Sequence, residues 1–299
     1  MPRTVSRGAA ARPYRGLVAG ALAEDRVADD RTTRALLSRA VPARARVIAE
    51  ARGVLSGIDG VREVAREMHL ALVVAKPDGA RVRPGTVVAV LEGDARRLLA
   101  VERTILNVLM HASGVATLTR RAVDAARGAR PRLEVLATRK TLPGLRDLEK
   151  AAVVHGGGQT HRRDLSAALL VKNNHLALVP LATAVARARA GARPGEPVEV
   201  EVRSVREALV AARAGADALL LDNTGPAGAR RIVRALASAG LRRGRRIELS
   251  GGITPDSVRR YRRVGADAVS LGALTHSAPA LPFHLRLEPR PPGLRPRPT

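Results

Sequence analysis

The sequence contains no cysteine among its 299 residues. This absence excludes a disulfide framework, a thiolate nucleophile and any zinc or iron–sulfur site with cysteine ligands. No apolar run reaches the roughly 18 residues of a membrane-spanning helix, and the basic N-terminus (MPRTVSRGAA) is not followed by the apolar segment of a signal peptide. We therefore expect a cytoplasmic protein without a membrane partner.

Aromatic residues and lysines are also scarce. The chain has one Phe, two Tyr and no Trp, and of its 52 basic side chains only those at positions 76, 140, 150 and 172 are lysines. The formal net charge of +25 favours anionic partners. However, the arginines are spread along the whole chain and side chains for base stacking are almost absent, which argues against nucleic-acid binding as the main function. In an arginine-rich chain, Lys140 and Lys172 become candidates for specific roles.

The length fits one large domain or two modest ones, and 45% hydrophobic residues suffice for a sizeable core. Residues 1–15 resemble a loosely held basic arm, and the stretch up to residue 127 mixes helices with short strands. From residue 133, apolar runs alternate with helical stretches. We predict strands at 133–137, 167–171, 198–202, 216–221, 246–249 and 266–271, with helices at 145–154, 181–190, 205–214, 227–239 and 256–264.

Strands that alternate with helices indicate parallel βαβ units. Six such units in this span favour a complete or partial β/α barrel, with an open doubly wound sheet as the competing fold. No GxGxxG follows the first strand, which weakens a dinucleotide-binding interpretation. In β/α barrels the chemistry lies at the carboxyl ends of the strands.

Charged and polar side chains follow the predicted strands. The cations suit a substrate with several carboxylates or phosphates, and the carboxylates suit Mg²⁺ or sugar hydroxyls. Glycine turns before helix starts expose backbone N–H groups where barrels bind phosphate. The groups are Arg139, Lys140, His161, Arg162 and Lys172 (cations), Glu201 and Asp222 (carboxylates), and Ser250-Gly251-Gly252 and Gly272-Ala273 (turns).

Each motif alone has a plainer interpretation. A Gly-Gly pair is often only a turn, Glu201 alternates with apolar residues as a solvated strand residue would, and Asp222-Asn223 suits a helix cap. His161 with the two arginines after it fits an exposed basic turn. The joint placement at successive strand ends favours a site, and anion, sugar, phosphate and Mg²⁺ together describe phosphoribosyl transfer.

These residues belong to a longer series of motifs whose order and spacing hold from about residue 20 to residue 285. The chain resembles the quinolinate phosphoribosyltransferase family, also called carboxylating nicotinate-nucleotide pyrophosphorylases. The motifs that carry the resemblance are Glu102-Arg103-Thr104-x-x-Asn107, Ser113-Gly114-x-Ala116-Thr117, Thr138-Arg139-Lys140-Thr141-x-Pro143-Gly144, Gly156-Gly157-Gly158-x-x-His161-Arg162, Lys172-x-Asn174-His175, Glu199-x-Glu201, Leu221-Asp222-Asn223, Ser250-Gly251-Gly252-Ile253 and Gly272-Ala273-Leu274-Thr275-His276-Ser277.

The resemblance implies an N-terminal α/β sandwich (1–112), an incomplete β/α barrel (113–275), and a C-terminal segment (276–299) that returns to the N-terminal domain and ends in a Pro/Arg-rich tail. It implies a homodimer or higher homo-oligomer with shared active sites. The reaction would convert quinolinate and phosphoribosyl pyrophosphate to nicotinate mononucleotide, pyrophosphate and CO₂, with Mg²⁺, in de novo NAD biosynthesis.

The resemblance also implies roles for the residues. The quinolinate carboxylates would be bound by Arg139, Lys140, His161 and Arg162, together with Arg103 from the neighbouring subunit. The phosphoribosyl group and its phosphates would be held by Lys172, Glu201, Asp222, Ser250, Gly251, Gly252, Gly272, Ala273 and His276. Lys140, Lys172, Glu201 and Asp222 would be the catalytic groups, and Glu201 and Asp222 would hold Mg²⁺, directly or through substrate and water.

Departures from the family pattern leave alternatives open. Asn173 stands where the family usually has Asp, which removes one negative charge near the phosphoribosyl group, and we hypothesise that it weakens turnover without abolishing it. Thr160 and Ala167 also differ from the usual Asn and acidic residue, and the glycine of an N-terminal Gly-Asp-x-Thr motif is missing near Asp29. A diverged paralogue that transfers phosphoribose to another aromatic carboxylate is one alternative, and a basic nucleic-acid-binding protein is another.

Overall fold

The computed structural model describes residues 12–289, and the chain divides into two compact units. Unit 1 comprises residues up to 117, residues 142–156 and residues from 278; unit 2 comprises residues 118–141 and 157–277. Most of the expected basic arm 1–15, and the tail beyond residue 289, lie outside the described residues. No helix within residues 12–289 combines the length and apolarity that crossing a membrane requires.

Unit 1 contains a four-stranded antiparallel sheet in the order β12-β1-β5-β3. Its strands are β1 (Pro42–Ala49), β3 (Ala71–Val74), β5 (Val87–Asp94) and β12 (Phe283–Pro289), and a separate pair joins β2 (Gly53–Val54) to β4 (Arg81–Val82). β12 pairs with β1 from Ala43↔Pro289 to Ala49↔Phe283, so the C-terminal segment returns to this unit.

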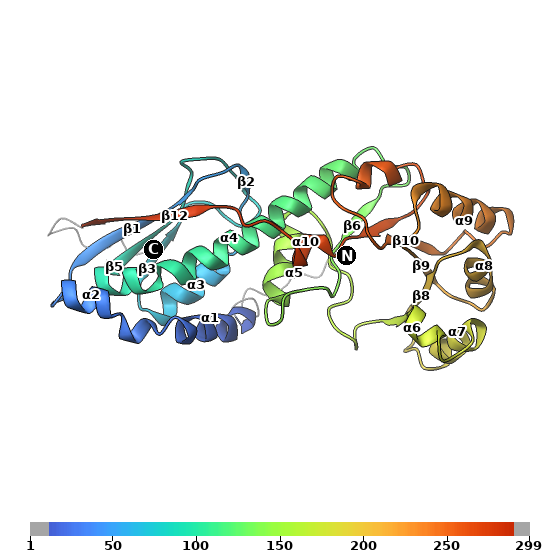
Figure 1. The fold of residues 1–299 in the computed structure, drawn as a ribbon, viewed down its shortest axis with the longest axis horizontal. Coiled ribbons are helices and arrows are strands. Elements are labelled where there is room, and N and C mark those ends of the chain that lie inside the picture. The colour runs from blue at the N-terminus through green and yellow to red at the C-terminus, as the bar shows by residue number, and fades with distance from the viewer. Residues whose placement is uncertain (1–11, 290–299) are drawn as a thin grey trace. The chain divides into compact units, whose positions relative to one another are not determined.

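Helices form the second layer of unit 1. They are α1 (Arg12–Glu24), α2 (Arg31–Leu36), α3 (Ile58–Glu67), the first part of α4 (Ala95–Ala126) and α5 (Arg146–His155), with a 3-10 turn at Val27–Asp29. In β1 every second residue is buried, so one face of the sheet meets the apolar side chains of α3 and α4 in a single core. Figure 1 shows α1, α3 and the first part of α4 beside the sheet, in agreement with the α/β sandwich that the family resemblance implies.

Unit 2 is built on six parallel strands in the order β6-β11-β10-β9-β8-β7. They are β6 (Glu134–Leu136), β7 (Leu169–Val171), β8 (Val198–Val202), β9 (Ala218–Asp222), β10 (Arg246–Ser250) and β11 (Ala268–Ser270). Consecutive strands are neighbours and the first pairs with the last, which is the order of a barrel rather than of a doubly wound sheet. The ladder lacks only a β6–β7 pair, so the barrel is incomplete, as predicted.

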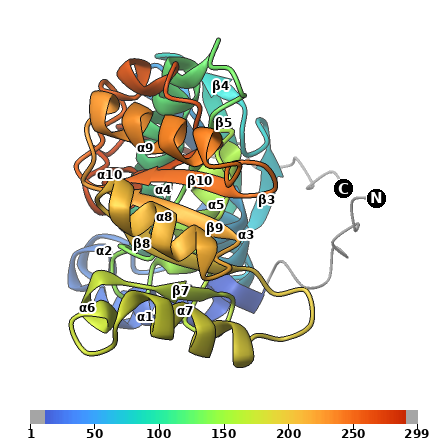
Figure 2. The same cartoon turned by 90° about the vertical axis from the view of Figure 1, so that its right-hand side faces the viewer.

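Helices cover the outside of this barrel. Figure 2 shows α7 (Leu181–Ala190), α8 (Val205–Arg213) and α9 (Pro226–Ser238) in front of the strands. Short helices α6 (Asn173–Leu176) and α10 (Ala273–His276) begin directly after β7 and near the end of β11. All six strands begin within two residues of their predicted first residues, and the carboxyl ends of these strands form the edge that the sequence marks as the site.

Two expectations differ from the structure. The helix expected at 256–264 is only a 3-10 turn at Val258–Tyr261, because Thr254 and Ser257 hydrogen-bond each other's backbone and side chain and so compete with helical bonds. Residues 142–156, expected within the barrel domain, belong to unit 1, and the unit boundary expected at 112/113 falls after Thr117, inside α4.

Candidate active site

Two arginines lie at the start of the barrel's carboxyl edge. Arg139 follows β6, and its Nε is buried with no hydrogen-bond partner among the described residues. The charge of Arg139 and, more strongly, burial lower the pKa of Arg162. A buried donor without an acceptor and a second guanidinium nearby are costly unless an anion binds both. This pair therefore fits a carboxylate ligand.

His161 lies between two buried carboxylates. Its Nε2 is 3.1 Å from Oε2 of Glu199 and 3.3 Å from Oε2 of Glu248, and hydrogen bonds to Glu199 and then Glu248 raise the pKa of His161 to about 9. Burial raises the pKa of Glu199, against the effect of His161. The three groups are close enough to hold a metal ion, but the raised pKa favours a proton on His161. The histidine is thus a cation that directly precedes Arg162 in the sequence.

A carboxylate pair, Glu201 and Asp222, lies at the ends of β8 and β9. The backbone N–H of Asn173 donates to Glu201 Oε2 at 2.9 Å, and the Asn173 side-chain amide donates to Asp222 Oδ2 at 3.3 Å. Arg203 donates to the same Asp222 oxygen from Nε and Nη2 at 3.2 and 3.1 Å. Asn173 therefore connects the two carboxylates, and Arg203 supplies a cation beside them.

Lys140, Gly272 and His276 come together beyond the end of β11. A Cβ added at Gly272 would lie 2.9 Å from both Lys140 Cδ and His276 Nε2, so only glycine fits there without displacement. The Thr275 hydroxyl donates to the Lys140 carbonyl at 2.7 Å and fixes this segment. The start of α10 at Ala273 follows immediately. A lysine, a histidine and a tight backbone turn are suited to a phosphate group.

The turn after β10 depends on glycine. Gly251 and Gly252 have φ angles of +82° and +61°, and a Cβ at Gly251 would lie 2.4 Å from Asn223 Oδ1. The Asn223 N–H donates to the Ser250 carbonyl at 3.0 Å, and the Ser270 hydroxyl donates to the Ser250 hydroxyl at 3.0 Å. Asn223, directly after β9, and Ser270, the last residue of β11, thus position this turn. The remaining predicted site residue at the barrel edge, Lys172, is half-buried and lies at the N-cap of α6.

Comparison with known proteins agrees with this geometry. Family models for the quinolinate phosphoribosyl transferase C-terminal and N-terminal domains match residues 115–286 and 30–113. The chain belongs to the quinolinate phosphoribosyltransferase family.

Relatives of the quinolinate phosphoribosyltransferase family match nearly the whole chain. A probable carboxylating nicotinate-nucleotide pyrophosphorylase of Methanothermobacter thermautotrophicus is 42% identical over 88% of this chain and 94% of its own length. The human carboxylating nicotinate-nucleotide pyrophosphorylase is 39% identical over 85% of each chain. The solved nicotinate-nucleotide pyrophosphorylase from Francisella tularensis has a TM-score of 0.85 at 31% identity, covering 95% of this chain and 98% of its own.

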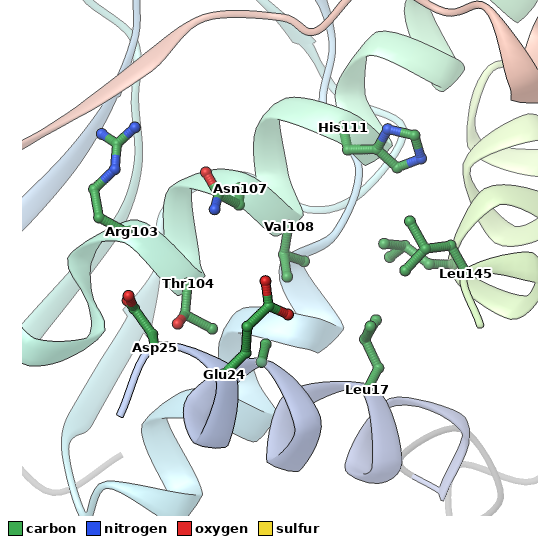
Figure 3. A pocket seen from close by; sticks show the side chains of 11 residues that line it. Leu17, Glu24, Asp25, Arg103, Thr104, Asn107, Val108, His111 and Leu145 are labelled. Atoms are coloured by element: carbon green, nitrogen blue, oxygen red, sulfur yellow. The ribbon is translucent and has the colours of Figure 1, made fainter. Parts of the chain in front are cut away.

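One residue assigned from the family resemblance lies in unit 1. Arg103 is exposed on α4 and lines a cavity of about 330 Å³ together with Asn107 and His111, which follow at helical spacing. Figure 3 shows these α4 residues on one wall and Leu17 and Glu24 of α1 on the other. The interpretation that Arg103 completes a neighbouring subunit's site stays a prediction.

Sequence reasoning missed two members of the site. Glu248 reads as a strand residue between apolar neighbours, and only strand register places it with Glu199 against His161. Arg203 was one arginine among many. Its one available signal was position: it follows the end of β8 directly, two residues after Glu201, where the alternation of the strand would place it on the same side as Glu201.

Proposed function

We propose that this protein transfers the phosphoribosyl group of phosphoribosyl pyrophosphate to quinolinate and releases pyrophosphate and CO₂. The observation that carries the proposal is the buried, unpartnered Nε of Arg139 beside Arg162, in a chain of this family. Quinolinate presents two adjacent carboxylates, and guanidinium groups bind carboxylates through paired hydrogen bonds. Lys140 and the protonated His161 supply further positive charge for this ligand.

The barrel edge supplies what the transfer step needs. The pyridine nitrogen forms a bond to the ribose anomeric carbon as the bond from that carbon to pyrophosphate oxygen breaks, so positive charge develops on the ribose. Glu201 and Asp222 favour this charge, and Lys172 stabilises the leaving pyrophosphate. The turns at Ser250-Gly251-Gly252 and Gly272-Ala273, with His276, hold the 5′-phosphate.

Decarboxylation follows from the charge on the ring. With its nitrogen alkylated, the ring accepts the electron pair of the bond to the 2-carboxylate when CO₂ leaves, and that carbon then takes up a proton. Lys140 and Arg139 stabilise the transient negative charge on the ring carbon. Most of the rate enhancement comes from holding both anionic substrates in place.

Mg²⁺ belongs to this proposal as a cofactor that neutralises the pyrophosphate. Glu201 and Asp222 each already accept hydrogen bonds from Asn173 or Arg203, so these carboxylates fit a cation held through the substrate and water better than a direct pair of ligands. A homodimer whose sites include Arg103 of the partner, and a cytoplasmic location, are further parts of the proposal.

The test is direct turnover. Purified protein with quinolinate, phosphoribosyl pyrophosphate and Mg²⁺ should yield nicotinate mononucleotide and CO₂ in equal amounts. Nicotinate, which has a single carboxylate, and aromatic dicarboxylates other than quinolinate serve as competing acceptors. A folded protein that forms no nicotinate mononucleotide, or that prefers another acceptor, would overturn the proposal; the second outcome would identify a diverged paralogue.

A further inference from the structure

Asp222 already has a positively charged partner in the protein. Its Oδ2 accepts three N–H groups, from Arg203 Nε at 3.2 Å, Arg203 Nη2 at 3.1 Å and Asn173 Nδ2 at 3.3 Å. Charge-assisted contacts of this kind occupy the lone pairs of Oδ2, which a divalent cation bound at this oxygen would need. The corner of Glu201, Asp222, Asn173 and Arg203 carries a formal charge of −1, from two carboxylates and one guanidinium.

Arg203 is placed to meet a ligand as well as Asp222. It follows the last residue of β8, and its backbone N–H is anchored to Glu207 Oε2 at 2.7 Å. The Asp222 side chain is 16% exposed, whereas that of Arg203 is 57% exposed. The guanidinium thus lies at the open side of the carboxylate pair. A guanidinium has five donors, so two bonds to Asp222 leave capacity for phosphate oxygens.

We propose that Arg203 is the resident cation of the Glu201–Asp222 pair, that it keeps divalent cations off these carboxylates in the free protein, and that it binds the diphosphate group of the phosphoribosyl donor. The donor part rests on the proposed function. Asn at position 173, in place of the usual Asp, also disfavours a divalent cation on the protein, because its amide donates to Asp222 where a carboxylate would repel Asp222 and add a negative charge. Together the two residues shift cation binding from the protein to the substrate.

The first test measures Mn²⁺ binding to the free protein by electron paramagnetic resonance, without any substrate. Any Mn²⁺ binding by the wild type should be unaffected by Asp222→Asn, because Asp222 is not a ligand in the free protein. Arg203→Gln, and more strongly Arg203→Gln with Asn173→Asp, should bind Mn²⁺ at least about tenfold more tightly than the wild type does, and Asp222→Asn should abolish this gain. Equal affinity in the wild type and the double variant would overturn the inference.

The second test measures binding of phosphoribosyl pyrophosphate by calorimetry, without quinolinate and without divalent cation. Arg203→Gln should weaken the affinity about tenfold, and Arg203→Lys should lose less because it keeps the charge. An affinity of Arg203→Gln within about twofold of the wild type would contradict the inference. Thermal unfolding of each variant checks that it is folded, and Arg203→Lys serves as the conservative variant of the same residue.

A matched control lies at the other end of β9, the strand that Asp222 ends. Arg189 donates to Asp217 at 2.9 Å, and Asp217 directly precedes β9. Arg189→Gln removes an ion pair of the same kind and should change neither Mn²⁺ nor donor binding. Neither test uses quinolinate, so both results can be interpreted even if quinolinate is not the acceptor. If Arg203→Gln turns over normally and its Mn²⁺ and donor binding are unchanged, the inference about Arg203 is rejected while the proposed function stands.

Discussion

At the scale of single residues, Arg139 is the clearest case for ligand recognition. Its buried Nε lacks a partner among the described residues, so a substrate carboxylate would satisfy it. We expect Arg139→Gln to weaken quinolinate binding about a hundredfold, because two charge-assisted hydrogen bonds are lost. Donor binding should stay within about twofold. Calorimetry with each substrate separately measures both effects.

A control for Arg139 is the exposed Arg243 in the same unit. Arg243→Gln removes the same charge from the barrel unit and should leave the affinity for quinolinate unchanged. Similar losses in both variants would mean that net charge, rather than the buried donor, attracts the substrate.

His161 predicts a pH dependence of stability. Hydrogen bonds to Glu199 and Glu248 raise its pKa from 6.5 to about 9, so the native state binds the proton more tightly than the unfolded chain does. This stabilisation is fully present below pH 6.5 and is lost as the pH rises through 9. We expect the free energy of unfolding to fall by about 2 kcal/mol between pH 7 and pH 10 on account of His161.

Urea denaturation at both pH values measures this loss. His161→Gln should be less stable at pH 7 and should show a smaller change with pH. His284, an exposed histidine bonded to Glu50 in unit 1, provides the matched substitution His284→Gln, which leaves His161 and its two carboxylates in place. A wild-type slope in His161→Gln would show that other groups titrate in this range.

At the scale of elements, the turn after β10 tests whether backbone shape positions the phosphate site. Alanine at Gly251 has to adopt a positive φ and also place its Cβ 2.4 Å from Asn223 Oδ1. Gly244 has a similar φ of +77° with nothing within 4 Å of the added Cβ. We expect Gly244→Ala to cost about 1 kcal/mol and Gly251→Ala about 3 kcal/mol in unfolding free energy.

Only the Gly251 variant should also weaken donor binding, measured by calorimetry beside denaturation curves for both. Equal stability losses would mean that Asn223 moves aside without cost. Unchanged donor affinity in a destabilised Gly251→Ala protein would separate this turn from the phosphate site.

The elements show how far the sequence predicts the fold. β8 (Val198–Val202) and α7 (Leu181–Ala190) match the predicted ranges, because apolar alternation and helical periodicity are local signals. The sequence predicts α5 as a helix but assigns it to the barrel domain, whereas it belongs to unit 1. Contacts with unit 1 explain this: the fully buried Glu149 accepts a hydrogen bond from His111 of α4, and His155 forms a hydrogen bond with Ser56. Those partners are far along the chain and leave no periodic trace.

The same limit applies to the site. Rules for strand ends indicate Arg139, Lys172 and Asp222, because parallel strands expose their carboxyl ends at one edge. They cannot indicate which side chains pair there. The pairing of Asp222 with Arg203 depends on the register of β8 and β9, in which Val202 lies beside Leu221. The sequence therefore predicts which residues lie at the site, but not which of their side chains form ion pairs and hydrogen bonds with each other.

At the scale of the whole molecule, the net charge of +25 reflects arginines in both units, many of them in ion pairs. Arg26 pairs with Asp29 in unit 1, and Arg121 pairs with Asp256 in unit 2, with all four side chains exposed. Exposed pairs of this kind contribute little to stability. The charges that matter for function are the few at the barrel edge, where burial makes an anion necessary.

Sharing of active sites between subunits gives the last prediction. Arg103 lies in unit 1 and Arg139 in unit 2. If each site combines Arg103 of one subunit with Arg139 of its partner, Arg103→Ala and Arg139→Gln proteins are each inactive, yet a mixed dimer contains one intact site. Random mixing makes half of the dimers mixed, so co-expression of the two chains should restore about a quarter of wild-type activity. Arg139→Gln mixed with Arg162→Gln is the matched control, because both changes fall in unit 2 and no site is intact. Light scattering first establishes the dimer, and a dimeric mixture of Arg103→Ala with Arg139→Gln that stays as inactive as the control would exclude shared sites.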